Sequence, residues 1–265
     1  MADQRKISLS VFTKPWKMPI PELGKFVSGM GFDAIEYPLR PGYPVAPENV
    51  SDLAKAAKQL AGFGVRIASL AGPTDEPTIA ACAEAAIPVI RTMVQVGQES
   101  YLAVEERTRR EFDSLLPLLD KYGVTIGVQN HCDAFVCNAL GLRRLAEGYD
   151  PKHIAIVWDA AHNALNGEDP EMAIDIVWSH LRMVNLKNAY WVRQNGPEAE
   201  SAVYSHYWTT GRHGMASWPR VAAELQKRDY RGVICLTAEY SDHASVDRLI
   251  AEDVSFAKSL LGWGM

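Results

Sequence analysis

The chain lacks the features that mark secreted and membrane proteins. Its four cysteines (Cys82, Cys132, Cys137 and Cys235) include no C-x-x-C pair and no zinc-ribbon spacing, so we expect reduced thiols. No apolar stretch approaches the roughly 20 residues that span a bilayer. The opening MADQRKISLSVF has neither the apolar core of a signal peptide nor a transit-peptide pattern. These absences favour a cytoplasmic protein without a membrane partner.

Long runs of like charge and nucleotide-binding motifs are missing as well. The formal net charge of −5 comes from 32 acidic and 27 basic residues spread along the chain, which argues against nucleic acid as a partner. The sequence contains no G-x-G-x-x-G after an expected strand, no Walker loop, no H-E-x-x-H and no G-x-S-x-G elbow. It therefore gives no support for a nucleotide cofactor or for serine hydrolysis.

What the chain does have is a regular alternation of short β-rich runs with longer helical patterns, typical of parallel βα units. The expected strands span residues 6–12, 33–38, 65–72, 88–96, 124–131, 153–159, 181–187 and 232–240. Gly31, Gly64 and Gly123 precede strands, where a left-handed residue would end a helix. Eight units in 265 residues predict an α/β fold, a (β/α)8 TIM barrel forming a single domain over residues 1–265.

One connection is much longer than the others. About 30 residues, from 188 to 217, separate the seventh strand from its helix, and they include several aromatic residues. Loops of this length are usually functional or disordered, and we expect an ordered lid over the barrel. The alternative is a surface loop or a contact in a homo-oligomer, because exposed aromatic residues also mark interfaces.

Polar residues stand at the ends of the expected strands, which is where (β/α)8 barrels build their active sites. These residues are Glu36, Gln129, Asn130, His131, Asp159, Asn185, Lys187, Asn188, Glu239 and Tyr240, with His162 three positions after Asp159. A single polar residue at such a position often caps a helix or meets solvent. Carboxylates or amides on four successive strands, however, are typical of a site for a hard cation or a polyol.

The motifs at these strand ends resemble those of the xylose-isomerase-like barrel superfamily, which includes sugar phosphate isomerases and epimerases, inosose dehydratases and the endonuclease IV group. The matching segments read GVQNH (127–131), WDAAH (158–162), VNLKN (184–188) and TAEY (237–240). In that family, Glu, Asp, His and Glu at these positions bind one divalent metal, and the two glutamates often act as an acid/base pair. By position the resemblance implies a variant metal site of Gln129, Asp159, Asn185 and Glu239.

Two of these four positions differ from the family pattern, and the differences change the expected chemistry. Gln129 and Asn185 replace a carboxylate and an imidazole, so the set presents two negative charges and no nitrogen ligand. Any divalent metal is then expected to be Mg²⁺, Mn²⁺ or Ca²⁺ rather than Zn²⁺. A glutamine cannot accept a proton from carbon, so two-base epimerisation loses one base.

A one-base reaction remains, in which Glu239 removes a proton next to a carbonyl. His162 or Lys187 would polarise that carbonyl or protonate a leaving oxygen, and Gln129 and Asn185 would orient hydroxyl groups. The alternatives are a structural role for His162 and a salt bridge from Lys187 to Glu36 or Asp159.

Further substrate contacts are expected from residues outside this set. Trp16 follows the first strand, beside Lys14, and is a candidate wall for a sugar ring, with a surface tryptophan as the alternative. In the long connection, Arg212 and His213 could bind a phosphate or carboxylate, or could face solvent. Glu36 and His131 complete the candidate substrate-binding residues.

These observations predict an enzyme that isomerises, dehydrates or β-eliminates a small sugar, keto-sugar or keto-glycoside. The alternative is a catalytically reduced sugar-binding barrel or a partner subunit of an enzyme complex. The endonuclease interpretation is disfavoured, because the chain has neither a multi-metal ligand cluster nor a basic groove.

Overall fold

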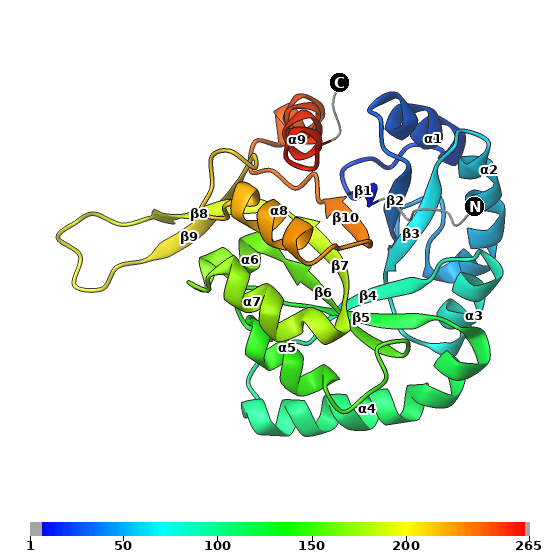
Figure 1. The fold of residues 1–265 in the computed structure, drawn as a ribbon, viewed down its shortest axis with the longest axis horizontal. Helices are drawn as coiled ribbons and strands as arrows, with labels where there is room; N and C mark the ends of the chain where they lie inside the picture. Colours follow the sequence, from blue (N-terminus) through cyan, green and yellow to red (C-terminus); the bar gives the residue numbers. More distant parts are fainter. Residues whose placement is uncertain (1–6, 263–265) are drawn as a thin grey trace.

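The eight runs expected as strands pair side by side into a closed parallel barrel in the computed structural model, which describes residues 7–262 (Figure 1). Around the barrel the strands follow the order β1-β10-β7-β6-β5-β4-β3-β2. Their bounds are β1 (Ser8–Phe12), β2 (Ala34–Pro38), β3 (Arg66–Ala71), β4 (Val89–Met93), β5 (Thr125–Gln129), β6 (Ile154–Asp159), β7 (Leu181–Leu186) and β10 (Val233–Leu236). The predicted (β/α)8 barrel is confirmed.

Helices connect the strands on the outside of the barrel (Figure 1). The α-helices are α1 (Ile20–Gly29), α2 (Leu53–Ala61), α3 (Glu76–Glu84), α4 (Tyr101–Tyr122), α5 (Ala139–Ala146), α6 (Ala160–Leu165), α7 (Pro170–Val177), α8 (Trp218–Lys227) and α9 (Val246–Leu260). Short 3-10 turns are η1 (Pro47–Asp52), η2 (Trp178–His180) and η3 (His243–Ser245). Gly31, Gly64 and Gly123 have φ of 83°, 73° and 67°, so each adopts the left-handed conformation expected where a helix ends.

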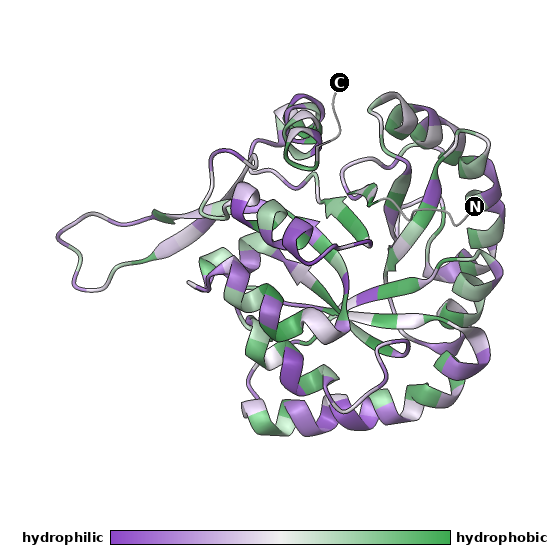
Figure 2. Ribbon diagram, in the orientation of Figure 1, coloured by the Kyte–Doolittle hydropathy of each residue, from purple (hydrophilic) through white to green (hydrophobic). Residues whose placement is uncertain are grey.

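Apolar side chains fill the space between the strands and the helices. Figure 2 shows many hydrophobic residues along the barrel strands, while hydrophobic and hydrophilic residues alternate along the outer helices. A smaller apolar cluster packs inside the barrel, because it joins β3 to strands on the other side, β6 and β7 among them: Phe12, Ala71, Val157, Met183 and Cys235. All four cysteines are free. Within residues 7–262, no helix has the length and apolar character needed to cross a membrane.

The long connection after β7 forms an antiparallel hairpin, β8 (Asn188–Arg193) with β9 (Tyr204–Thr209). The hairpin extends away from the barrel (Figure 1). Its base packs against the barrel, where Ala189 and Trp208 meet the apolar cluster of Cys132, Ala161 and Leu165, and Trp191 Nε1 donates to the backbone oxygen of Leu165. That this segment acts as a lid over the barrel mouth stays a prediction. The extent of the single domain, residues 1–265, also stays a prediction. The hairpin's clear contribution is to place Trp208 at the barrel rim.

Candidate active site

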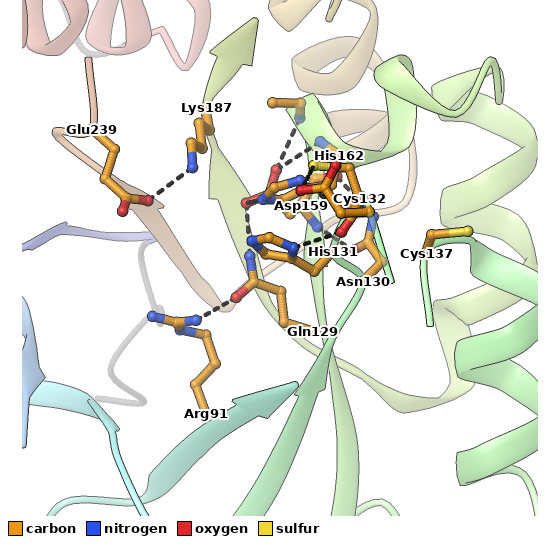
Figure 3. Close-up of polar contacts among 12 residues, drawn as sticks. Arg91, Gln129, Asn130, His131, Cys132, Cys137, Asp159, His162, Lys187 and Glu239 are labelled. Carbon is orange, nitrogen blue, oxygen red and sulfur yellow. Dashed lines mark hydrogen bonds and ion pairs between the residues drawn. The ribbon is translucent and has the colours of Figure 1, made fainter. Parts of the chain in front are cut away.

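The predicted polar residues of strands five to eight converge at the carboxyl ends of the barrel strands (Figure 3). Gln129 and Asp159 are the last residues of β5 and β6, and Asp159 lies opposite Asn185 in the register of β6 and β7. Lys187 directly follows β7. The last strand, β10, ends at Leu236, so Glu239 comes from the connection that follows it rather than from within the predicted strand 232–240. The geometry of a parallel barrel explains why these side chains meet.

A buried chain of hydrogen bonds links β2, β4, β5 and β6. The Arg91 Nε donates to Glu36 Oε1 at 2.7 Å, and Ser69 Oγ donates to the same oxygen at 3.1 Å. The second arm of the Arg91 guanidinium donates to Gln129 Oε1, and Gln129 Nε2 donates to Asp159 Oδ2 at 2.9 Å. Carboxylate, guanidinium, amide and carboxylate thus follow one another across one side of the barrel, and Figure 3 shows the part from Arg91 through Gln129 to Asp159.

Arg91 was missed by the sequence analysis. Its side chain is 6% exposed and its guanidinium carbon lies 4.9 Å from the centroid of the Phe12 ring. The available signal was a charged residue in the middle of the apolar run PVIRTMVQV, because a buried arginine requires a partner. That partner, Glu36, is fully buried.

Asp159 caps the helix that follows it. Its Oδ1 accepts hydrogen bonds from the backbone N–H groups of Ala161 and His162 at 3.0 and 3.1 Å, at the start of α6. Complete burial raises the pKa of this carboxyl to about 6, against the opposing influence of Lys187 and the backbone donors. Both oxygens of Asp159 are therefore engaged, one by the helix start and one by Gln129.

His162 is held in one tautomer by the backbone. The N–H of Cys132 donates to His162 Nδ1 at 3.1 Å, so the proton of the neutral ring resides on Nε2, which lies 4.0 Å from Asp159 Oδ2. Burial, followed by Lys187, holds the pKa of His162 well below its usual range. The pKa of the neighbouring His131 is also lowered, mainly by burial. His162 is thus a neutral hydrogen-bond donor.

Glu239 is clamped by two lysines. Lys187 Nζ lies 2.8 Å from Glu239 Oε2, and Lys14 Nζ contacts the other oxygen. Burial raises the pKa of Glu239, but the two ammonium groups outweigh it and bring the pKa down to about 2. Lys187 also lies 3.5 Å from the centroid of the Trp208 ring. The partner of Lys187 is therefore Glu239, neither Glu36 nor Asp159.

A cavity of about 390 Å³ lies beside Glu239 and Lys14. Its walls combine charged and aromatic groups, in the way that sites for small polar ligands do. The lining residues are Lys14, Pro15, Trp208, Ala238, Glu239, Tyr240, His243 and Val246. Trp208 and Tyr240 offer the apolar faces on which a sugar ring can pack.

Three predicted substrate-binding residues are not brought to this cluster. Trp16 is buried against Phe26, with its Nε1 donating to Asp247 at 2.8 Å, so it presents no open face. Arg212 stacks on Phe256 at 3.8 Å, outside the barrel mouth. His213 Nδ1 lies 2.6 Å from Thr210 Oγ1. Each of these side chains contacts a neighbour that the sequence pattern does not reveal. Trp208, rather than Trp16, provides the aromatic wall of the cavity.

The residues implied as metal ligands do not fit a divalent ion as they are arranged. Arg91 occupies the Gln129 oxygen, Gln129 and the start of α6 occupy Asp159, and two lysines occupy Glu239. Among the four, only the Asn185 oxygen is buried without a partner. Glu36 pairs with Arg91 and Glu239 pairs with Lys187 and Lys14, while the two oxygens of Asp159 accept hydrogen bonds from the Gln129 amide and from backbone N–H groups.

Other groups with ligand atoms lie nearby. The ligand atoms of His131, Cys132 and His162 are within 4.8 Å of one another, so ligating side chains are present at this rim. In the tautomer described above, however, His162 directs its lone pair at the Cys132 backbone. The structure thus contains potential ligands but no open, correctly charged set among the residues it describes.

A parallel eight-stranded barrel with acid, amide and amine side chains gathered at the carboxyl ends of its strands defines a (β/α)8-barrel protein with an enzyme-like site. The chain belongs to the xylose isomerase-like TIM barrel family, whose model matches residues 25–260. The family resemblance predicted from the strand-end motifs is confirmed.

Curated relatives include an inosose dehydratase of Bacillus velezensis, 24% identical over 124 residues, which are 45% of this chain and 42% of the relative. An inosose dehydratase of Mesomycoplasma hyopneumoniae is 21% identical over 170 residues, which are 59% of this chain and 57% of the relative. The chain thus spans about half the length of the curated relatives it matches.

Solved structures with the same fold include D-psicose 3-epimerase in the presence of D-fructose, with a TM-score of 0.70 and 12% identity over 97% of this chain and 100% of the other. The 3-keto-D-glucoside 4-epimerase of E. coli gives a TM-score of 0.73 and 13% identity over 96% and 100%. A probable 3-DHS dehydratase of Bacillus anthracis gives 0.71 and 13% over 94% and 98%. At these identities the likeness establishes the fold alone.

Proposed function

We propose that this protein is an isomerase or dehydratase that acts on a small keto-sugar or related cyclic keto-polyol by removing a proton next to the carbonyl. The observation that carries the proposal is the Lys187–Glu239 pair, 2.8 Å apart, with Glu239 lining the cavity beside the Trp208 ring. The names of the relatives support it, since they are dehydratases and epimerases of inosose, keto-glucoside and ketose substrates.

In this proposal, Glu239 takes the proton and Lys187 stabilises the charge that develops. The ammonium group of Lys187 hydrogen-bonds the carbonyl oxygen as it becomes an enolate oxygen, an interaction that is stronger in the transition state than in the ground state. A carboxyl with a pKa of about 2 is a weak base. When the substrate oxygen accepts from Lys187, Glu239 loses one cationic partner and becomes more basic.

Neutral groups around the pair orient the hydroxyls of the substrate. The Nε2–H of His162 donates, and the unpartnered oxygen of Asn185 accepts. Gln129 is already bound to Arg91 and Asp159, so its role is to hold Asp159 rather than to bind the substrate. Glu239 is the single base: in an isomerisation it returns the proton to the former carbonyl carbon, and in a dehydration it gives the proton to the departing β-hydroxyl, which leaves as water.

No step of the proposed reaction runs through a divalent metal or a nucleotide cofactor. Mg²⁺, Mn²⁺ or Ca²⁺ at Gln129, Asp159, Asn185 and Glu239 was predicted from the family pattern, and the engaged donor atoms do not support that set.

Two further predictions, a cytoplasmic location and a homo-oligomer, remain part of the proposal. Free cysteines agree with a reducing cytoplasm. Exposed aromatics on the hairpin, Trp191, Tyr204 and Tyr207, agree with a homo-oligomer contact.

Solvent deuterium exchange tests the proposed proton abstraction directly. Incubating the protein in D₂O with a panel of keto-sugars, keto-glycosides and inososes should introduce deuterium next to the carbonyl of the true substrate, as detected by NMR. Lys187→Met should slow this exchange by about 10²-fold or more, because it removes the group that stabilises the enolate. Binding of a panel member without exchange would instead favour a sugar-binding barrel without turnover, which the double lysine clamp on Glu239 also makes a candidate.

The second lysine gives a pH-dependent test. Lys14 lowers the pKa of Glu239, so Lys14→Met should raise that pKa and move the acid limb of kcat/KM to higher pH by about one unit. The sign follows because Glu239 must be ionised to act as a base, so activity is lost as pH falls through its pKa. Lys17→Met, in the same loop but directed at Tyr43, is the matched control. An unshifted acid limb in Lys14→Met would remove Glu239 as the titrating base.

A further inference from the structure

The side-chain amide of Gln129 lies between two charged groups of opposite sign. On one side is the guanidinium of Arg91, which donates to Gln129 Oε1. On the other side is the carboxylate of Asp159, which accepts from Gln129 Nε2 at 2.9 Å. All three side chains are almost fully buried, so water does not compete for these contacts.

The Arg91 guanidinium and the Asp159 carboxylate together fix the orientation of the Gln129 amide. If the amide were turned over, its NH₂ would face the N–H groups of Arg91 and its oxygen would face the Asp159 carboxylate, leaving both contacts repulsive. The guanidinium is itself fixed, because its Nε is bound to the buried Glu36 at 2.7 Å. Arg91 therefore determines that Gln129 presents a donor, rather than an acceptor, to Asp159.

A donor at this point changes what Asp159 can bind. A carboxylate at position 129 would face Asp159 with like charge, and the two would need a cation between them. The Gln129 NH₂ group instead donates a hydrogen bond to Asp159. The full positive charge lies on Arg91, which donates to the oxygen of the same amide. The Asp159 oxygen nearest to strand five is thereby satisfied without any ion.

We propose that Arg91 is a positioning residue which, through Gln129, takes the place of a divalent cation at this centre, so that the protein binds no divalent metal there. The replacement of a family carboxylate by Gln129 is then compensated by an internal cation, Arg91, whose guanidinium donates to the amide. The remaining carboxylate, Glu239, is neutralised in the same way by Lys14 and Lys187.

Metal binding tests this proposal without any substrate. The full-length protein should release all divalent metal on dialysis, as measured by elemental analysis, and millimolar Mn²⁺, Co²⁺ or Mg²⁺ should change its Tm by less than about 1 °C. Gln129→Glu should gain Mn²⁺ binding, because two carboxylates then face one another, with a rise in Tm of about 5 °C at saturating metal. Gln129→Met also breaks the hydrogen bonds from Arg91 through residue 129 to Asp159 but adds no charge, so it should gain no Mn²⁺ binding.

A second measurement addresses the role of Arg91 itself. The Gln129 side-chain NH₂ should exchange slowly with solvent in NMR spectra of ¹⁵N-labelled protein, with its signal assigned by its loss in Gln129→Met. Arg91→Lys keeps the charge but cannot reach Glu36 and Gln129 together, so it should abolish that protection.

Stoichiometric divalent metal retained by the wild-type protein would overturn the proposal, as would a wild-type Tm rise with Mn²⁺ equal to that of Gln129→Glu. Protected NH₂ protons in Arg91→Lys would remove Arg91 as the residue that orients the amide. Because these readouts involve no turnover, their failure is distinguishable from failure of the proposed keto-sugar activity.

Discussion

Replacing Glu239 by glutamine is expected to lower kcat/KM on the true keto-sugar substrate by about 10³-fold or more. Glutamine keeps the size of the side chain and can still accept a hydrogen bond from Lys187, but it cannot take a proton from carbon. Steady-state kinetics across the substrate panel, with circular dichroism to verify folding, measure the effect. The matched control is Glu48→Gln on η1, an exposed glutamate for which unchanged kinetics are expected.

The competing candidate for the base is Asp159, whose pKa is raised to about 6 by burial. A carboxyl with that pKa is a stronger base than Glu239 in the free protein. If Glu239→Gln retains turnover while Asp159→Asn abolishes it, the base is Asp159 and the proposed division of roles is wrong. We expect the opposite result, because both oxygens of Asp159 are already engaged, by Gln129 and by the start of α6.

Arg91→Met is expected to lower the free energy of unfolding by about 3–5 kcal/mol. The substitution leaves Glu36, which is fully buried, without its cation, and it also frees Gln129. Urea denaturation followed by circular dichroism measures the change through the shift in midpoint. Adding Glu36→Gln to Arg91→Met should recover part of the loss, since the uncompensated buried charge is then removed as well.

An exposed ion pair provides the control for this experiment. Arg107 and Glu111 form an exposed pair on α4, where Arg107→Met is expected to cause only a small loss of stability, because solvent screens the pair. A loss as small as this in Arg91→Met would mean that Glu36 reaches another partner or takes up a proton. The hydrogen bonds from Arg91 to Glu36 and Gln129 would then contribute little to the free energy of unfolding.

The barrel could be predicted from the sequence because its strands are local patterns. Each apolar run of suitable length that is followed by a helical pattern, often ending in glycine, identifies one βα unit. Most predicted strands differ from the observed ones only at their ends. The final strand is the exception. Thr237 to Tyr240 look like strand residues, but Ala238 has a positive φ of 51°, so the chain turns there and directs Glu239 into the cavity.

The candidate site could be located from the sequence but its charge state could not. Strand-end positions follow from the barrel, and so Gln129, Asp159, Asn185 and Glu239 were found with the lysine at 187. The expected metal set, the sugar-stacking role of Trp16 and the anion-binding role of Arg212 depended on which neighbours these side chains would meet. No sequence pattern specifies those neighbours.

The sequence by itself thus determined the (β/α)8 barrel, its family and the rim that carries the site, because periodicity and strand ends are set by residues close together in the chain. Only the tertiary structure decided the pairings: Arg91 with Glu36 across 55 positions, Lys187 with Glu239 across 52, and Lys14 with Glu239 across 225. The physical reason is that the energy of a buried charge depends on its partner in space. In this barrel those partners are the internal cations Arg91, Lys187 and Lys14.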